Sequence, residues 1–172
     1  MNFLKRLFGG SPNPTAEWPI LPPATPVVDL RTGEIGPLRR KSPLSDARAL
    51  GSPSRYTHNA GSNPDLLYAP AGFLLEYEEN ALVEATFFIG ADEGAPAEPS
   101  LKFCKPTLIT HDGTRHQLHS EMKFDAVERA LGKPARREAD SDEVLLEWEI
   151  NGITIWAEFD EHQRLWKLSV FL

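Results

Sequence analysis

The chain has 172 residues, one cysteine and a formal net charge of −7. Its length suits one large domain or two small ones that share a core, and a single cysteine excludes an internal disulfide. The negative charge argues against a general DNA- or RNA-binding protein. Residues 1–41 carry six Lys or Arg and three Asp or Glu, so the remainder has a charge of about −10. An acidic body of this kind speeds association with a basic partner.

Residues 1–10 combine four large apolar side chains with Lys5 and Arg6 on the opposite face of a short helix. A secretory signal peptide has its charge ahead of a longer apolar stretch, and this segment does not. We expect either a short helix packed on the folded body or a weak contact with an anionic membrane surface. No stretch approaches the roughly 20 apolar residues that cross a membrane. With the single cysteine, this composition predicts a cytoplasmic protein.

Prolines dominate residues 11–26, which favours an extended segment over a helix or a central strand. Trp18 and Ile20 within it are expected to attach the segment to the folded body. We therefore predict that residues 1–26 form a tail and linker ahead of the first folded unit.

The same order of elements occurs twice along the chain, which predicts two tandem units, residues 27–89 and 101–172. Residues 90–100, rich in Ala, Gly, Pro and acidic residues, form the predicted linker between them. Each unit opens with a short apolar strand and a turn dipeptide, Thr32-Gly33 in the first and Asp112-Gly113 in the second. A duplication of this kind predicts a broad sheet to which both units contribute.

A short helix follows in each unit, at about residues 43–50 and 121–131. Ser42 and Ser120 are placed to cap the two helices. Each helix is expected to stop at a glycine followed two residues later by a proline, which cannot continue it. These endings are Gly51-Ser52-Pro53 and Gly132-Lys133-Pro134.

Segments with an apolar and polar alternation of period two come after each helix and predict strands. In the first unit they cover residues 73–78 and 82–89, and in the second residues 144–150, 153–159 and 165–171. The polar faces of these strands are mostly acidic. The prediction is an α+β fold in which each unit contributes a short helix and antiparallel strands to one curved antiparallel sheet.

A short helix ending in Leu-Gly-x-Pro, followed by antiparallel strands with a conspicuous aromatic residue, resembles the unit of the small outer-membrane lipoproteins of the β-barrel assembly machine. The tandem arrangement resembles the β-lactamase inhibitory protein family, whose two units bind an enzyme across a concave sheet. The resemblance covers residues 27–89 and 101–172. The chain has neither a lipobox cysteine nor the cysteine pairs of the secreted inhibitors. What remains is similar to cytoplasmic immunity proteins of bacterial toxin systems, and this resemblance implies the neutralisation of a toxin.

His111, His116 and His119 lie close together in the sequence, and a metal site needs ligands that converge on one point. On a strand His111 and His116 would face opposite sides, so surface histidines around a hairpin are favoured over a metal site. Cys104 is expected to be a small, buried or half-buried apolar residue on a strand, because a nucleophile would need a neighbouring base. We expect no catalytic residue, no metal and no cofactor.

Glutamates alternate along several predicted strands. A solvated sheet face, a catalytic pair of carboxylates and a protein-binding face all agree with that spacing. Trp156 shares a face with Glu158, and a partly exposed tryptophan is a typical binding hot spot unless a helix covers it. The predicted partner-binding residues are Glu76, Glu78, Glu147, Glu149, Trp156 and Glu158.

The sequence therefore predicts a non-enzymatic protein inhibitor, an immunity protein that binds one cognate toxin domain through an acidic sheet face. The expected partner is a basic protein, and neither nucleic acid nor more than a weak membrane contact is expected. The alternative is a structural or assembly module whose sheet recruits a cellular protein. An enzyme with an unfamiliar site has the least support.

Overall fold

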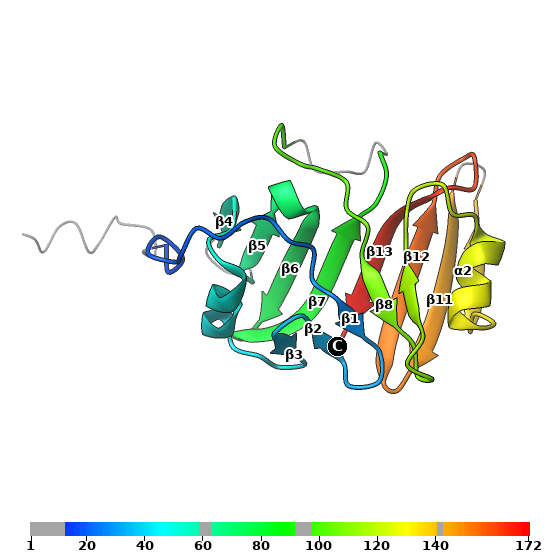
Figure 1. Cartoon of the computed structure of the whole chain (residues 1–172), viewed down its shortest axis with the longest axis horizontal. Coiled ribbons are helices and arrows are strands. Elements are labelled where there is room, and N and C mark those ends of the chain that lie inside the picture. Colours follow the sequence, from blue (N-terminus) through cyan, green and yellow to red (C-terminus); the bar gives the residue numbers. More distant parts are fainter. Residues whose placement is uncertain (1–12, 59–62, 92–97, 141–142) are drawn as a thin grey trace, which may run out of the picture.

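The computed structural model describes residues 13–58, 63–91, 98–140 and 143–172, which form two β-sheets and short helices (Figure 1). The helices are the 3-10 helices η1 (Leu44–Leu50) and η2 (Ala69–Ala71) and the α-helix α2 (Phe124–Leu131). The fold is α+β, as the sequence predicts, and most of its regular structure is strand.

The larger sheet draws on both halves of the chain. Its eight strands have the order β10-β11-β12-β13-β7-β6-β5-β4, and all neighbours pair antiparallel. The strands are β4 (Arg55–Thr57), β5 (Asp65–Tyr68), β6 (Phe73–Glu78), β7 (Ala81–Phe88), β10 (Arg136–Ala139), β11 (Val144–Ile150), β12 (Ile153–Phe159) and β13 (Leu165–Phe171). The two halves meet at the centre of the sheet, where β7 pairs with β13.

A second sheet of five short strands has the order β3-β2-β1-β8-β9. Its strands are β1 (Val28–Asp29), β2 (Glu34–Ile35), β3 (Leu38–Arg39), β8 (Thr107–Ile109) and β9 (Arg115–Gln117). β1 and β8 pair in parallel, with Val28 opposite Leu108. The predicted single antiparallel sheet is therefore wrong. Val28, Leu30 and Leu108 are at most 1% exposed, because the first strands of the two halves form a second layer over the core instead of extending the larger sheet.

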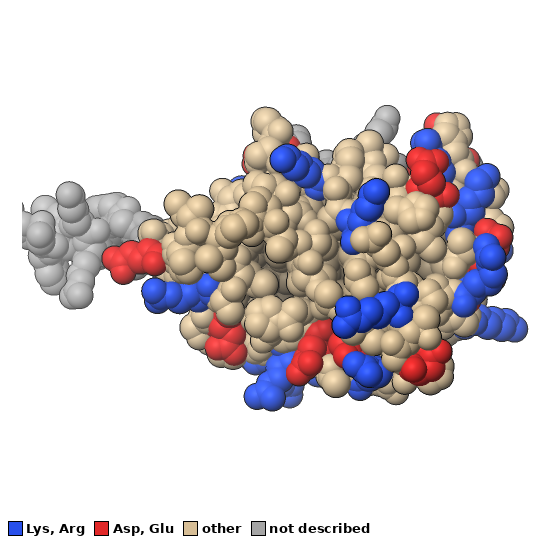
Figure 2. Space-filling view, viewed as in Figure 1, with Lys and Arg blue, Asp and Glu red and all other residues tan. Residues whose placement is uncertain are grey.

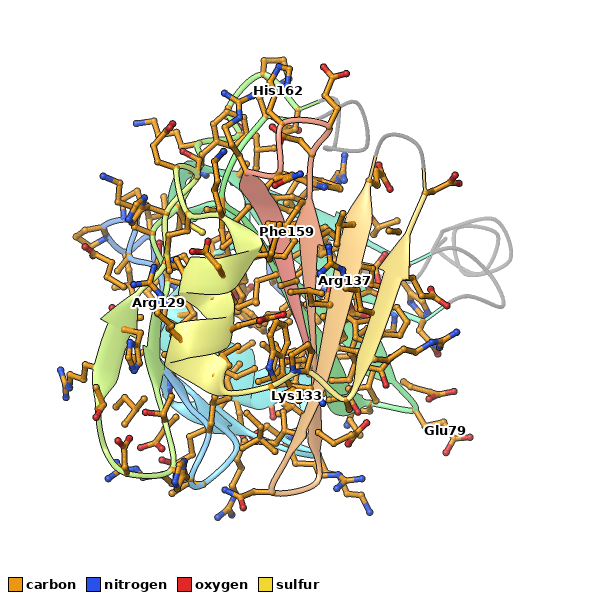
Figure 3. All side chains as sticks on the ribbon, turned by 90° about the vertical axis from the view of Figure 1, so that its right-hand side faces the viewer. Glu79, Arg129, Lys133, Arg137, Phe159 and His162 are labelled. Carbon is orange, nitrogen blue, oxygen red and sulfur yellow. The ribbon has the colours of Figure 1, made fainter. Side chains whose placement is uncertain are left out.

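The hydrophobic core lies between the two sheets and beneath η1 and α2 (Figure 1). Along β12, for example, Ile153, Ile155, Ala157 and Phe159 are buried in it, while the residues between them are half-buried on the other side. Figure 3 shows α2 and the smaller sheet on the same side of the larger sheet. No helix or sheet in the described part of the chain covers its other side, which we call the open face.

Both predicted helix stops are confirmed, and both predicted caps are wrong. Gly51 and Gly132 end η1 and α2 with φ of 88° and 87°, a region that glycine adopts readily. The N-cap positions come one residue after Ser42 and three after Ser120, and neither position has a side-chain capping bond. The Ser42 hydroxyl instead accepts the backbone N–H of Arg39 at 3.1 Å, so the turn before η1 uses it.

The described part of the proline-rich tail contacts the folded body through one of its two predicted residues. Trp18 is half-buried and packs against the core, as predicted. Ile20 is 93% exposed, so its predicted contact is wrong. The backbone N–H of Ser52 binds the carbonyl of Pro19 at 2.8 Å, which holds the tail by its main chain there. The helix predicted within residues 1–10 lies outside the described residues.

Two hydrogen bonds tie an aromatic side chain of the larger sheet to the end of a helix, one in each half. The Tyr68 hydroxyl donates to the Gly51 carbonyl at 3.3 Å, and the Trp148 indole N–H donates to the Gly132 carbonyl at 2.8 Å. Tyr68 on β5 and Trp148 on β11 therefore make similar contacts with the glycine that ends a helix.

Strand pairings in the two halves also correspond. Arg55 and Arg136 open the two edge strands and pair at corresponding points with β5 and β11. A register shift interrupts the β6–β7 and β12–β13 pairs at corresponding positions. In the central pair, Thr86 lies opposite Ser169. The two halves therefore share the pairing pattern of their strands.

Candidate functional site

The open face carries the residues that the sequence predicts for partner binding. Strand alternation and the burial of every second residue place them on this side of β6, β11 and β12. They are Glu76, Glu78, Glu147, Glu149, Trp156 and Glu158. The structure brings them to one side of one sheet, but their surroundings differ, and several unpredicted residues lie between them.

Three carboxylates form a row across neighbouring strands of the first half. Asp65 on β5 lies opposite Glu76 on β6, and Glu76 lies opposite Glu84 on β7. Burial raises the pKa of Glu76, the charges of Glu84 and Asp65 raise it further, and Lys167 opposes them. Burial also raises the pKa of Asp65, although Arg55 lowers it in part. We call Asp65, Glu76 and Glu84 the acidic row.

Two hydroxyl groups at the centre of the open face orient the end of this row. The Thr86 hydroxyl donates to Glu84 Oε1 at 2.9 Å and lies 3.1 Å from the Ser169 hydroxyl. Thr86 has a single hydroxyl proton, so Ser169 donates to Thr86. Both residues are at most 5% exposed. The chain of two bonds holds the Glu84 carboxylate in one position.

Glu158 differs from the acidic row because a lysine neutralises it. Lys167 on β13 lies opposite Glu158 on β12, and its ammonium group is 2.7 Å from the carboxylate. The two side chains are 24% and 18% exposed. The Lys167 ammonium group also lies 4.9 Å from the centre of the Trp166 ring. The negative charge of Glu158 is therefore compensated within the protein itself.

Trp156 and Phe171 form an aromatic pair on the open face of the second half. Their ring centres are 4.7 Å apart and the planes are inclined by 62°, an edge-to-face arrangement. Trp156 is half-buried, and its indole N–H is buried with no hydrogen-bond partner among the described residues. The exposed part of Trp156 is thus its carbon ring. α2 lies on the other side of the sheet (Figure 3), so it does not cover this ring.

Two predicted glutamates border the aromatic pair. Glu147 on β11 lies opposite Trp156 on β12, and Glu149 lies opposite Thr154. The Thr154 hydroxyl donates to Glu149 Oε1 at 2.7 Å. The aromatic surface of the second half therefore has carboxylates along the side that faces β11.

Sequence reasoning missed the residues that connect these features: Asp65, Glu84, Thr86, Lys167, Ser169 and Phe171. Alternation along β7 and β13 places Glu84 and Lys167 on the polar side, so that part of the signal was present in the sequence. Their neighbours depend on the pairing of β7 with β13, whose partner residues are 79 to 87 positions apart. Alternation within one strand carries no information about that pairing.

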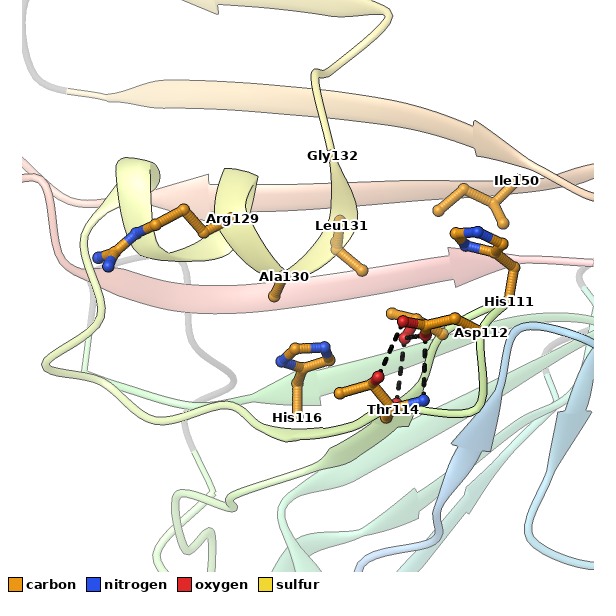
Figure 4. A pocket seen from close by; sticks show the side chains of 10 residues that line it. His111, Asp112, Thr114, His116, Arg129, Ala130, Leu131, Gly132 and Ile150 are labelled. Carbon is orange, nitrogen blue, oxygen red and sulfur yellow. Dashed lines mark hydrogen bonds between the residues drawn. The ribbon is translucent and has the colours of Figure 1, made fainter.

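A pocket of about 370 Å³ lies between the β8–β9 hairpin and the C-terminal end of α2 (Figure 4). His111, Asp112 and His116 contribute to its lining. The Asp112 carboxylate accepts the Thr110 hydroxyl at 2.6 Å and the N–H and hydroxyl of Thr114 at 3.0 and 2.9 Å. These bonds, that from Thr110 first, lower the pKa of Asp112. All three bonds lie within the β8–β9 hairpin, so the Asp112 carboxylate stabilises its turn.

The prediction that His111 and His116 face opposite sides is wrong, because both line this pocket. His111 follows the end of β8 and lies in the turn, where strand alternation no longer applies. In Figure 4 the two rings approach the pocket from different ends. Within the described ranges, no three His, Cys, Asp or Glu side chains are grouped so that they would hold a metal ion.

Cys104 is buried, as predicted, but it lies between β7 and β8 rather than on a strand. Its thiol donates to the Gly72 carbonyl at 3.2 Å, and burial raises its pKa to about 12. A Cβ atom on Gly72 would lie 2.8 Å from the Cys104 Cβ. Close packing therefore explains the cysteine, and the raised pKa leaves little of the reactive thiolate.

The face of the molecule that bears the smaller sheet, opposite the open face, carries charges of both signs. Figure 2 shows it with Lys and Arg among Asp and Glu side chains, spread around a largely uncharged centre. No helix in the described part of the chain combines the length and the apolar character needed to cross a membrane.

No protein-family model matches the chain, and no curated protein sequence matches it. Among solved structures, the chain is similar to a DUF4309 family protein, YjgB, from Bacillus subtilis subsp. subtilis str. 168. The two share 16% sequence identity over 83% of this chain and 89% of that chain, with a TM-score of 0.47. A likeness at this level does not assign a function.

Proposed function

We propose that the protein binds one basic protein partner through the open face and does not itself catalyse a reaction. The acidic row carries this proposal, because Asp65, Glu76 and Glu84 are like charges directly opposite one another on neighbouring strands. Such pairs destabilise a sheet, and the raised pKa of Glu76 has the same cause in part. Basic side chains of a partner would relieve the repulsion, and the acidic surface would speed their approach.

We infer that the two halves of the chain are two equivalent units joined where β7 pairs with β13. The matched bonds at the helix ends and the matched edge arginines support this inference. Thr86 and Ser169 then lie on an approximate twofold axis between the units, at the centre of the open face. A partner seated at this centre would contact both units, as the resemblance to the β-lactamase inhibitory protein family implies.

We further propose that the partner is a toxin domain and that this protein is its cytoplasmic immunity protein. The resemblance to bacterial immunity proteins supports the proposal, and so do the acidic row and the partly exposed Trp156. Tryptophan is enriched among the few residues that supply most of the binding energy of an interface. An assembly module would use the same face to recruit a resident cellular protein.

Co-expression with the protein encoded by the adjacent gene tests the immunity proposal. Cells that make the toxic domain of the adjacent gene's product should survive only when the protein described here is made as well. A variant with the acidic row neutralised, D65N/E76Q/E84Q, should protect less at an equal soluble level. The control E34Q/E161Q neutralises exposed carboxylates outside the row and should protect fully. Equal death with and without the chain would contradict the immunity proposal and favour the assembly module.

A further inference from the structure

One corner of the open face is apolar in the first half of the chain and is covered by the chain itself. Leu67, Ala69 and Phe88 form a buried cluster there, at most 3% exposed, and Leu74 and Leu101 pack against it. Leu101 comes from the segment between β7 and β8. A side chain from outside the sheet thus completes this corner.

Backbone hydrogen bonds hold that covering segment on the sheet. The N–H of Lys102 donates to the Ala69 carbonyl at 2.9 Å, and the N–H of Cys104 donates to the Phe88 carbonyl at 2.8 Å. Leu101 is therefore fixed over the corner by its own main chain.

The matched registers give each residue of this corner a counterpart in the second half. Starting from Tyr68 and Trp148, the counterparts follow along the strands and across their pairings. The pairs are Leu67 with Glu147, Ala69 with Glu149, Leu74 with Trp156, and Phe88 with Phe171. Two apolar residues of the first half are thus replaced by glutamates, and the other two positions remain apolar.

The corner in the second half has no counterpart of Leu101 among the described residues. Neither Trp156 nor Phe171 belongs to, or packs against, either of the hydrophobic clusters. Arg136 lies opposite Glu147 but pairs with Glu138 instead. The corner therefore offers two aromatic rings with carboxylates beside them.

We propose that an arginine side chain of the basic partner occupies this corner, its aliphatic stem on the rings and its guanidinium group at Glu147 and Glu149. This inference rests on the proposed function and names the group that the open face recognises. An apolar side chain such as that of Leu101 could not form an ion pair with either carboxylate. Arginine supplies an apolar stem, stacks on aromatic rings and matches carboxylates with its planar fork of donors. A side chain that is apolar along its length and cationic at its end complements both parts of the corner.

The ring of Trp156, rather than its N–H, makes this contact, because the indole nitrogen is buried. Trp156→Phe keeps an aromatic ring and removes the unpartnered N–H, so it should retain arginine binding. Trp156→Leu installs the residue found at the corresponding position, Leu74, and should weaken arginine binding. The two substitutions separate the aromatic surface from the polar atom.

Nuclear magnetic resonance of the full chain tests the proposal with end-blocked Gly-Arg-Gly and Gly-Leu-Gly peptides as probes. The arginine peptide should shift the Phe171 ring and the amides around Trp156 in a saturable way, in the wild type and in W156F. In W156L, and separately in E147Q/E149Q, its affinity should fall about tenfold, the scale of a desolvated cation–π or charge contact. Unchanged melting temperatures would confirm that the variants remain folded.

Equal shifts from the leucine peptide, or arginine shifts confined to the acidic row, would overturn the proposal. Its failure is distinguishable from failure of the proposed function. Protection from the toxin together with an unresponsive corner would overturn the arginine site alone. Arginine binding at this corner without protection from the toxin would support the site and contradict the immunity function.

Discussion

The hydroxyl groups of Thr86 and Ser169 lie 3.1 Å apart where the two halves of the chain meet. Thr86 uses its proton on Glu84, at 2.9 Å, so Ser169 is the donor between them. This order of donors makes the two hydroxyls unequal, although they occupy corresponding positions.

Thr86→Val should destabilise the protein by about 1–3 kcal/mol, because it removes the hydrogen-bond partner of the half-buried Glu84 and of the buried Ser169. Ser169→Ala removes only the outer donor and should cost less than about 1 kcal/mol. Urea unfolding of both variants measures the difference. Equal losses, or a larger loss for Ser169→Ala, would contradict the assigned direction of the hydrogen bonds.

Glu76→Gln should raise the melting temperature at neutral pH. Burial and the neighbouring carboxylates raise the pKa of Glu76 in the folded state, so the folded protein binds a proton more readily than the unfolded chain. The free energy of unfolding of the wild type therefore decreases as the pH rises through the folded-state pKa of Glu76. The advantage of glutamine should shrink as the pH falls below the ordinary pKa of glutamate, where the side chain is protonated in both states.

Thermal melts of wild type and Glu76→Gln across this pH range measure the effect. Glu78→Gln is the matched control, since Glu78 is on the same strand but exposed, and it should change the melting temperature little. An advantage for Glu76→Gln that persists unchanged in acid would show that charge repulsion is not its cause.

Trp148→Phe should destabilise the protein by about 2–4 kcal/mol, because it leaves the Gly132 carbonyl unpaired and opens a space in the core. Its counterpart Tyr68→Phe should cost about 1 kcal/mol, since the Tyr68 hydroxyl makes longer bonds, 3.3 Å to Gly51 and 3.4 Å to Ala47. Denaturant unfolding compares the two. A larger loss for Tyr68→Phe would contradict the correspondence of these two contacts as ring-to-helix-end anchors.

Local chemistry explains which parts of the fold were predictable. Gly51 and Gly132 stop their helices through their own φ angles, and β11, β12 and β13 follow alternations that lie within single segments. The smaller sheet was not predicted, because its central contact pairs Val28 with Leu108, 80 residues apart. No local pattern specifies a parallel pair of strands this short.

The candidate site likewise has a part that could be predicted from the sequence and a part that could not. The side of the sheet that bears Glu147 and Trp156 follows from strand alternation. The acidic row requires the register of three strands, and the neutralisation of Glu158 by Lys167 requires the pairing of β12 with β13. Long-range pairing therefore decides which of the predicted glutamates are compensated and which are not.

Charge reversal at the border of the aromatic pair should act on the rate of association. E147K/E149K should slow association with the partner and weaken its dependence on salt, because such charges steer encounter over distances that salt screens. Stopped-flow mixing with the adjacent gene's product at several salt concentrations measures both effects. An unchanged association rate at low salt would contradict a role for these carboxylates in steering.

Titration calorimetry with the adjacent gene's product measures whether the acidic row binds a basic protein. Relative to wild type and to the control E34Q/E161Q, D65N/E76Q/E84Q should bind at least about tenfold more weakly, equivalent to about 1.4 kcal/mol. Its melting temperature at neutral pH should not fall, because the substitutions remove repulsion within the row. An affinity equal to that of wild type, with the fold intact, would show that the acidic row does not bind the partner.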